Sequence, residues 1–341
     1  MAYTTINKPN TQMNTVLYTG NGGTQSITGV GFQPDWTWLK ARNEAASHEL
    51  FDANRGVTKT INSNTNNAEA TQTDSLTAFG SDGFTLGSNG DINYNNSTYV
   101  GWNWKAGGTA SSNTDGSITS SVSANTTSGF SVVTFTGTGS NATIGHGLGV
   151  KPDAVFFKRL DTTGGWASYH SVLGATKYMR LDTNSGEQTA SDEFQNTEPT
   201  SSVISIGTDG AVNGTSMVAY CFADVKGFSK FNSYVGNGST DGPFIFTGFK
   251  PAFVLIKKSN TSGTDWQLTD NKRDLHNVCT HRLLPNDSIA EQTDSLDLDI
   301  LSNGFKIRKS STTSNASGAT YIYLAFAENP LVGTNNVPAT A

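Results

Sequence analysis

The sequence predicts an all-β protein made of three tandem antiparallel β-sandwich repeats, each jelly-roll-like and about 95 residues long. Two observations predict this fold. The same landmarks recur three times along the chain, and the runs between them are short, rich in β-branched and aromatic residues, and bounded by Gly and Pro. Helical periodicity is weak throughout. The 36 glycines among 341 residues are typical of a chain with many tight turns.

The three repeats open alike. Each begins with an aromatic residue and a Gly-rich turn, and 16 or 17 residues later a proline starts an apolar run that ends in a lysine. The composition of these runs predicts buried strands, and Pro is tolerated at the first strand position because its missing N–H costs the ladder least there. The openings are 18–24, 135–140 and 234–240, and the runs are Pro34 to Lys40, Pro152 to Lys158 and Pro251 to Lys257.

The repeats also close alike, on strands at 99–105, 217–223 and 321–327. Side chains alternate between the two faces of a strand, so every second residue of each closing run shares one face. Because these residues agree in position and size, each repeat is expected to bury that face of its last strand. They are Val100, Trp102 and Trp104; Val218, Tyr220 and Phe222; and Ile322, Leu324 and Phe326.

Composition divides the chain into segments. The stretch between the first two repeats is rich in Gly, Ser and Thr and predicts a flexible or extended linker, whereas the second and third repeats meet almost directly and should pack together. The expected segments are a polar arm at 1–13, repeats at 14–107, 129–226 and 227–330, the linker at 108–128 and a tail at 331–341.

The composition excludes several classes of protein. Charged residues make up 15%, the formal net charge is -6 and no basic run occurs, which argues against a nucleic-acid partner. No apolar run approaches the roughly 20 residues that span a bilayer, so no membrane insertion is expected. The N-terminal residues do not form a secretory signal. These features fit a protein that is made in the host cytoplasm and reaches the outside within a virus particle, a virion.

Five motifs stand out in the first and third repeats. They are Gly31-Phe32-Gln33-Pro34-Asp35-Trp36, Asp82-Gly83-Phe84-Thr85-Leu86-Gly87, Gly101-Trp102-Asn103-Trp104-Lys105-Ala106-Gly107, Gly248-Phe249-Lys250-Pro251-Ala252-Phe253 and Tyr321-Ile322-Tyr323-Leu324-Ala325-Phe326-Ala327-Glu328-Asn329-Pro330. With these motifs the chain resembles the repeat-containing virion proteins of tailed bacteriophages, especially phages of marine bacteria and cyanobacteria. The resemblance covers nearly the whole chain, although the middle repeat lacks the aromatic before Pro152. It implies a structural or adhesive virion part, often at the tail, and supplies no catalytic residues.

The tryptophans raise the question of sugar binding, because aromatic faces stack on flat ligands. Trp102 and Trp104 belong to a closing strand and are expected in the core. Trp166 and Trp266 are the candidate ligand-binding residues, because they lie in Gly-rich stretches at matching distances from the prolines of their repeats. The first repeat has His48 in that region. The alternative interpretation makes Trp166 and Trp266 half-buried strand aromatics.

No metal site and no cofactor are expected. His276, Cys279 and His281 lie close together in the sequence, but no fourth ligand has the spacing that zinc sites usually require. Cys221 alternates with aromatic neighbours and is interpreted as a small buried residue. Whether it pairs with Cys279 stays open.

No catalytic residues are assigned either. The sequence lacks a phosphate-binding loop, a Gly-x-Ser-x-Gly elbow and a His-Glu-x-x-His motif. Arg55 and Arg273 follow Asp52 and Asp270 in repeat-related loops, where ion pairs are expected to fix the loops. Glycoside cleavage needs two carboxylates that meet in a cleft, which a sequence does not show.

The expected function is that of a non-enzymatic virion structural protein, exposed at the phage tail or a tail fibre and adhesive toward the host surface. The expected partners are other virion proteins and a host cell-surface glycan or envelope protein. A homo-oligomer, taken as a trimer, is expected as well. Two alternatives stay open. One is a capsid or tail decoration or adaptor protein, in which three units of one chain imitate a trimer at a symmetry axis. The other is a tail-borne polysaccharide depolymerase.

Overall fold

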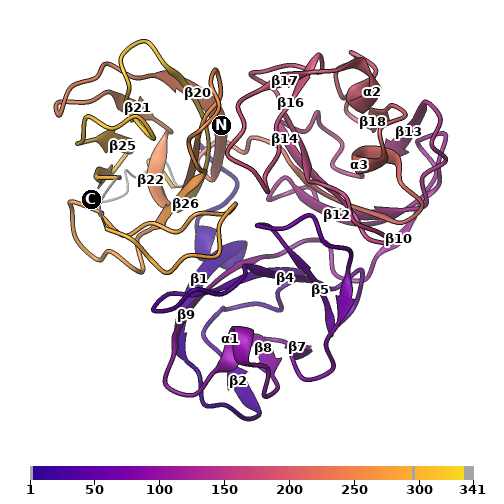
Figure 1. Ribbon diagram of the computed structural model, residues 1–341, viewed down its shortest axis with the longest axis horizontal. Helices are drawn as coiled ribbons and strands as arrows, with labels where there is room; N and C mark the ends of the chain where they lie inside the picture. The colour runs from indigo at the N-terminus through magenta and orange to yellow at the C-terminus, as the bar shows by residue number, and fades with distance from the viewer. Residues whose placement is uncertain (1–2, 294–295, 334–341) are drawn as a thin grey trace.

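A computed structural model describes residues 3–293 and 296–333. Within them the protein is mostly β, with antiparallel strands in several sheets, three α-helices of four residues each and a 3-10 helix at Pro9–Thr11. Three lobes surround a common centre and follow one another in chain order from indigo to yellow (Figure 1). We name them by their sheets as the first lobe (13–104), the second lobe (111–222) and the third lobe (229–330).

The first lobe contains a large inner sheet and a small outer sheet. Its strands are β1 Met13–Thr19, β2 Gln25–Ile27, β3 Trp36–Ala41, β4 Glu49–Asp52, β5 Lys59–Asn62, β6 Ala70–Thr71, β7 Leu76–Gly80, β8 Gly83–Leu86 and β9 Thr98–Trp104, with helix α1 Gly90–Asn93. The inner sheet has the order β1-β9-β3-β4-β5-β6 and the outer sheet the order β2-β8-β7. A Cβ at Gly83 would lie 2.0 Å from the Ile27 carbonyl oxygen, so only glycine fits the turn that starts β8.

The second lobe extends the same arrangement by two strands. Its strands are β10 Ser111–Asn113, β11 Ser120–Asn125, β12 Phe130–Phe135, β13 Ala142–Gly145, β14 Ala154–Arg159, β15 Ala167–His170, β16 Lys177–Tyr178, β17 Gln188–Thr189, β18 Val203–Ile206 and β19 Met217–Phe222, with helices α2 Ser191–Phe194 and α3 Gly210–Asn213. The inner sheet has the order β10-β11-β12-β19-β14-β15, and β13-β18 and β16-β17 form small sheets.

The third lobe repeats the arrangement without the two extra strands. Its strands are β20 Ser229–Val235, β21 Phe244–Phe246, β22 Phe249–Lys258, β23 Gln267–Asp270, β24 Leu298–Leu301, β25 Gly304–Ile307 and β26 Thr320–Pro330. The inner sheet has the order β20-β26-β22-β23 and the outer sheet the order β21-β25-β24.

One strand order therefore occurs in all three inner sheets: β1-β9-β3-β4, β12-β19-β14-β15 and β20-β26-β22-β23. In each, the closing strand of the lobe lies in the middle and pairs antiparallel with both neighbours. The register is equivalent too, since Trp36 pairs with Trp104, Ala154 with Phe222 and Phe253 with Phe326. Residues of different lobes can thus be compared position by position.

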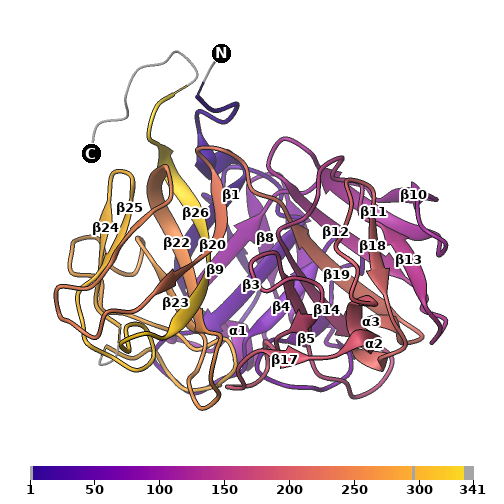
Figure 2. The same cartoon turned by 90° about the horizontal axis from the view of Figure 1, so that it is seen from above.

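The closing strands are buried on both faces, which is more than the sequence predicted. The predicted face lies between the lobes: Trp36 packs against Tyr220 with ring centroids 4.5 Å apart, and Phe222 packs against Phe326 at 5.8 Å. The opposite face lies inside each lobe, where Cys221 is fully buried, as its alternation with aromatic residues predicted. The three inner sheets thus enclose a central aromatic core. Figure 2 shows the ribbons of these sheets from a second direction.

The segment 108–128, expected to be a linker, instead contains β10 and β11. In the register of β11 with β12, Val122 pairs with Val133 and Ser123 with Val132. A ladder needs only backbone N–H and C=O groups, so a Ser- and Thr-rich run with few aliphatics still forms strands when a free sheet edge is available. Val122 and Ser123 lie on opposite faces of β11 and are both buried, so the strand is covered on both sides at this point.

The described part of the arm, residues 3–13, packs onto the third lobe. Thr4 and Ile6 are buried, and the hydroxyl of Tyr3 donates to the Gly248 carbonyl over 2.9 Å. The Leu331 backbone N–H bonds the same carbonyl over 3.3 Å. Of the tail at 331–341, residues 334–341 lie outside the described part of the chain.

Candidate functional site

The two tryptophans singled out in the sequence lie at interfaces between lobes. Trp166 of the second lobe and Trp266 of the third are 0% and 1% exposed, so neither ring presents a face to a ligand in solution. The indole Nε1 of Trp166 donates to the Asn62 carbonyl of the first lobe at 2.9 Å. That of Trp266 donates to the Arg180 carbonyl of the second lobe at 3.0 Å. Both tryptophans join neighbouring lobes.

His48 occupies the equivalent position of the first lobe, directly before β4. Its Nδ1 accepts from Nε1 of Trp38 at 2.9 Å, which places the proton of the neutral ring on Nε2. Burial lowers the pKa of His48 well below its usual value, and the backbone carbonyl of Leu284 opposes this shift more weakly. Leu284 of the third lobe occupies the position equivalent to Asn62 and Arg180. Unlike the indole nitrogens of the two tryptophans, however, Nε2 of His48 forms no hydrogen bond within the described chain.

Two backbone hydrogen bonds join the neighbouring lobes beside each of Trp166, Trp266 and His48. Between the first and second lobes, Gly164 N donates to Asn66 O at 2.8 Å and Glu69 N to Leu160 O at 2.9 Å. The equivalent bonds between the second and third lobes are Gly263 N to Asn184 O and Glu187 N to Ser259 O; those between the third and first are Ala46 N to Ser288 O and Glu291 N to Arg42 O. The three interfaces are therefore built alike, and the lobes close into a ring.

Equivalent buried ion pairs occur in the first and third lobes, and each is contacted by a side chain of a neighbouring lobe. Arg55 bonds the Asp52 carboxylate, the Glu69 carboxylate and the Leu50 carbonyl, and the hydroxyl of Tyr220 reaches Asp52 from the second lobe. In the third lobe, Arg273 makes the equivalent bonds to Asp270, Glu291 and the Leu268 carbonyl, and Trp102 reaches Asp270 from the first lobe. These contacts confirm the prediction that the two arginines fix their loops.

A buried lysine ends the apolar run of each lobe. Lys40, Lys158 and Lys257 have 0% exposure, and burial lowers the pKa of each to about 8. Their ammonium groups bond backbone carbonyls; Lys158 Nζ, for example, donates to Gly164 O at 2.6 Å and to Asn66 O at 3.3 Å. Lys40 and Lys257 bond carbonyls of their own lobes, whereas Lys158 also reaches the first lobe through Asn66.

The two cysteines do not form a disulfide, and His281 pairs with a carboxylate. Cys221 and Cys279 are free and buried, and burial raises the pKa of each thiol to about 12. His281 Nδ1 lies 2.6 Å from the Asp274 carboxylate. Within the described residues, the one group of three potential metal ligands is a different set, Asp192, Glu193 and Asp209.

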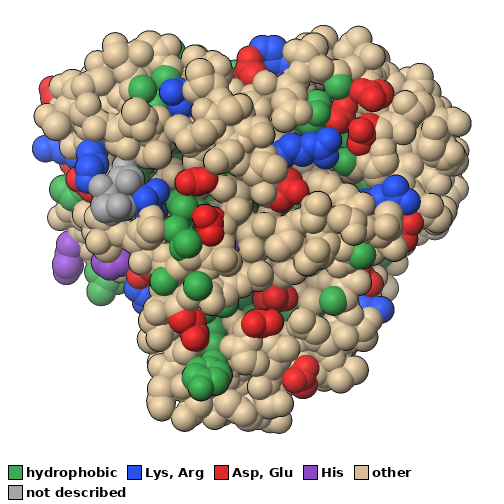
Figure 3. All heavy atoms as spheres, viewed as in Figure 1, with side chains coloured by type: hydrophobic (Ala, Val, Ile, Leu, Met, Phe, Trp, Pro, Cys, Tyr) green, Lys and Arg blue, Asp and Glu red, His purple; other side chains and the backbone are tan. Residues whose placement is uncertain are grey.

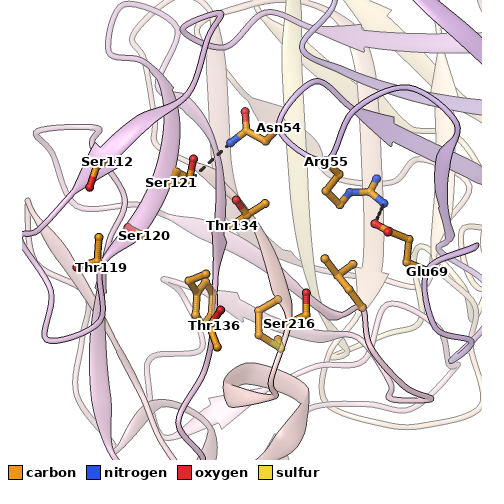
Figure 4. Close-up of a pocket in the computed structure, with 13 residues that line it drawn as sticks. Asn54, Arg55, Glu69, Ser112, Thr119, Ser120, Ser121, Thr134, Thr136 and Ser216 are labelled. Atoms are coloured by element: carbon orange, nitrogen blue, oxygen red, sulfur yellow. Dashed lines mark hydrogen bonds and ion pairs between the residues drawn. The ribbon is translucent and has the colours of Figure 1, made fainter. Parts of the chain in front are cut away.

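A polar groove of about 550 Å³ lies between the first and second lobes. Strands β10, β11 and β12 of the second lobe form one wall, and Asn54, Arg55 and Glu69 of the first lobe form the other. In Figure 4, Ser112 and Thr119 lie on one side and Arg55 and Glu69 on the opposite side. The lining residues are Asn54, Arg55, Glu69, Ser112, Thr119, Ser120, Ser121, Thr134, Phe135, Thr136, Leu160, Ser216 and Met217.

Hydroxyl groups form a row along the β10–β11–β12 wall. Ser112 pairs with Ser121 across one ladder, and Ser121 with Thr134 across the next, so the three side chains stand roughly 5 Å apart on one face. Within the described chain, none of these hydroxyls forms a hydrogen bond, nor do those of Thr119 and Thr136. Each is therefore free to donate one bond and to accept bonds from a ligand.

The charges of the groove balance. Arg55 and Glu69 form an ion pair with 3.1 Å between Nη1 and the carboxylate, and Lys59 lies 3.5 Å from the other oxygen of Glu69. Asn54 donates to the Val132 carbonyl at 2.9 Å and so ties the two walls together. The groove suits a neutral, hydroxyl-rich ligand better than an anionic one.

Sequence analysis missed this groove because its wall lies in the segment assigned as a linker. A usable signal was present: the Asn- and Gly-containing stretch 113–116 separates two short Ser/Thr runs, 111–112 and 119–121, as a turn separates two strands. Ser and Thr are, however, equally typical of loops. Acidic and basic side chains are both scattered over the face seen in Figure 3. Among the described helices, none has the length and hydropathy needed to cross a bilayer.

The comparisons with known proteins give a family and no activity. The sequence profile of a domain of unknown function, DUF7483, matches residues 8–330. No curated protein and no solved structure matches the chain. Since the match spans nearly all of the sequence and all three lobes, the chain belongs to the DUF7483 family.

Proposed function

We propose that this chain is a structural protein of a tailed-phage virion, made in the host cytoplasm and exposed on the particle at the tail or a tail fibre. The motifs that resemble phage virion proteins, such as Gly31 to Trp36 and Gly248 to Phe253, support this proposal. The observation that carries it is the closed ring of three lobes with equivalent interfaces. Such a ring is a rigid scaffold whose loops are free to vary.

The proposal includes a finer description of the fold. The three lobes are tandem β-sandwich repeats of about 95 residues, jelly-roll-like in shape, each with an inner and an outer sheet. The recurring strand order and the equivalent pairs Trp36–Trp104, Ala154–Phe222 and Phe253–Phe326 support it.

The protein acts by adhesion and not by catalysis in this proposal. Among the described residues that line the groove, Glu69 is the one carboxylate, and Arg55 holds it in an ion pair. Glycoside cleavage uses two carboxyl groups that flank the bond, so the groove suits binding better than a depolymerase reaction. Its partners are other virion proteins and the host surface, and several copies, taken as three, assemble together.

A decoration or adaptor protein on the capsid or tail is the second candidate. The three equivalent interfaces favour it, because one chain then presents three similar lobes around an axis, as a trimer does. Such a chain fits a threefold position of a larger assembly, where it would stabilise its neighbours rather than recognise the host.

Mass spectrometry of purified particles tests the shared part of both candidates. We expect the protein in particles at a fixed ratio to the other structural proteins; its absence would sink the proposal. Gold-labelled antibodies on intact particles then separate tail from head, and binding of the purified protein to host cells separates adhesion from decoration.

A further inference from the structure

The groove between the first and second lobes breaks the threefold pattern of the molecule. Strands β10 and β11 have no counterpart in the inner sheets of the other lobes, where β1 and β20 are the edge strands. The two backbone bonds recur at all three interfaces without them, so these strands are not needed to close the ring. What they add is the hydroxyl-lined wall of the groove.

The equivalent positions of the other lobes lack this row of hydroxyl groups. Thr134 and Thr136 correspond to Leu17 and Thr19 in the first lobe and to Ser233 and Val235 in the third, since each position is fixed by its pairing with the closing strand. Only the second lobe carries a hydroxyl at both positions and adds hydroxyls on the next two strands. The hydroxyl row is thus a property of this groove and not of the repeat.

We propose that the groove binds a neutral oligosaccharide, an inference that rests on the proposed surface exposure and names the ligand of that site. The unpaired hydroxyls of Ser112, Ser121 and Thr134 match a polyhydroxyl ligand, because each partner then both donates and accepts. Their spacing of roughly 5 Å between strands places successive contacts along an extended chain of sugar rings.

The remaining lining supports a sugar over other polar ligands. Among the residues that line the groove, the one cation, Arg55, is paired with Glu69, so no unpaired cation of the lining holds a phosphate or a uronate. Carbohydrate recognition therefore falls to this groove, and the buried indoles of Trp166 and Trp266 serve the lobe interfaces.

The test uses the full chain and a printed array of neutral and anionic oligosaccharides, followed by calorimetric titration with the neutral oligosaccharide that gives the strongest signal. Two variants remove hydroxyls from different strands: Thr134→Val with Thr136→Val, and Ser112→Ala with Ser121→Ala. Valine keeps the shape and the strand preference of threonine. Thr189→Val, at an exposed position of β17 outside the groove, is the matched control.

We expect binding of neutral glycans, about tenfold weaker in each double variant and unchanged in the control. Circular dichroism confirms that each variant is folded, and the serine pair keeps the test valid if the threonine pair is not. No binder on the array, a preference for anionic glycans, or equal affinity in folded double variants would overturn the inference. Mass spectrometry of particles reports on the proposed function separately, because virion incorporation does not require an occupied groove.

Discussion

The hydroxyl of Tyr220 in the second lobe donates to Oδ2 of Asp52 in the first lobe over 2.7 Å, inside the central core. Asp52 also holds Arg55, so the bond joins a buried ion pair of one lobe to the closing strand of the next. Tyr220→Phe removes the donor and leaves the carboxylate short of one partner. We expect the free energy of unfolding to fall by about 1–3 kcal/mol, measured by urea denaturation.

Tyr94→Phe provides the control for this variant. Tyr94 is 60% exposed, so loss of its hydroxyl should change stability by less than about 0.5 kcal/mol. Equal stability of Tyr220→Phe and the wild type would show that the bond between the lobes contributes nothing.

Trp166→Phe tests the interface role of the indole. The substitution keeps an aromatic ring but removes the Nε1–H that reaches the Asn62 carbonyl, and it should cost about 1–3 kcal/mol. Trp266→Phe should cost a similar amount, because its indole makes the equivalent bond to Arg180. Thermal and urea unfolding of both variants measure this. Unchanged stability together with lost binding to host cells would instead favour a ligand-binding role.

The buried lysines predict a gain of stability in mild alkali. Burial lowers the pKa of Lys158 from 10.5 to about 8 in the folded protein, so between these values the unfolded chain binds more protons. Stability therefore rises as the pH increases from about 8 toward 10.5. Lys158→Met should flatten this rise by about 1–2 kcal/mol between pH 7.5 and 9.5. Urea unfolding at both pH values measures it, and Lys8→Met, at an exposed position, should keep the wild-type slope.

His170 predicts a loss of stability in acid. The ring is buried, Nδ1 accepts from Val172 N, and Nε2 faces the Tyr323 carbonyl at 3.4 Å, so the folded protein holds the neutral form. Burial lowers the pKa of His170 from 6.5 to about 4. The unfolded chain thus binds more protons between these values, and stability is lost as the pH falls from 6.5 toward 4.

The variant His170→Asn removes the titrating ring, so the pH dependence of stability should weaken by about 2 kcal/mol between pH 7 and 4.5. The amide oxygen of asparagine still accepts from Val172 N, which preserves the local turn. Guanidinium unfolding at both pH values measures the difference. His276→Asn, at an exposed position, should behave as the wild type. An acid response that stays the same in His170→Asn would contradict the assignment.

The sequence carried enough information for the strands but not for their partners. The prolines and lysines of the runs mark the ends of β3 and β14 well, and alternation placed Trp102 and Tyr220 on a buried face. What covers that face could not be predicted, since burial between lobes and burial within a lobe leave the same apolar pattern.

The groove and the interface bonds could not be predicted from the sequence for a different reason. Backbone contacts such as Gly164 N to Asn66 O leave no trace in residue type. The hydroxyl wall was hidden because Ser112 and Ser121 are compatible with a loop as well as with a strand. Only the three-dimensional placement of β10 beside β11 distinguishes the two.

The closed ring has a consequence for the order of the chain. Tyr3 and Leu331 both bond the Gly248 carbonyl, so the first and last described parts of the chain lie side by side. The third and first lobes meet through the same two backbone hydrogen bonds as the covalently consecutive pairs. No lobe is therefore structurally the first, and a circular permutant opened at the exposed Lys226, with residues 3 and 331 bridged by a short linker, should fold to the same ring.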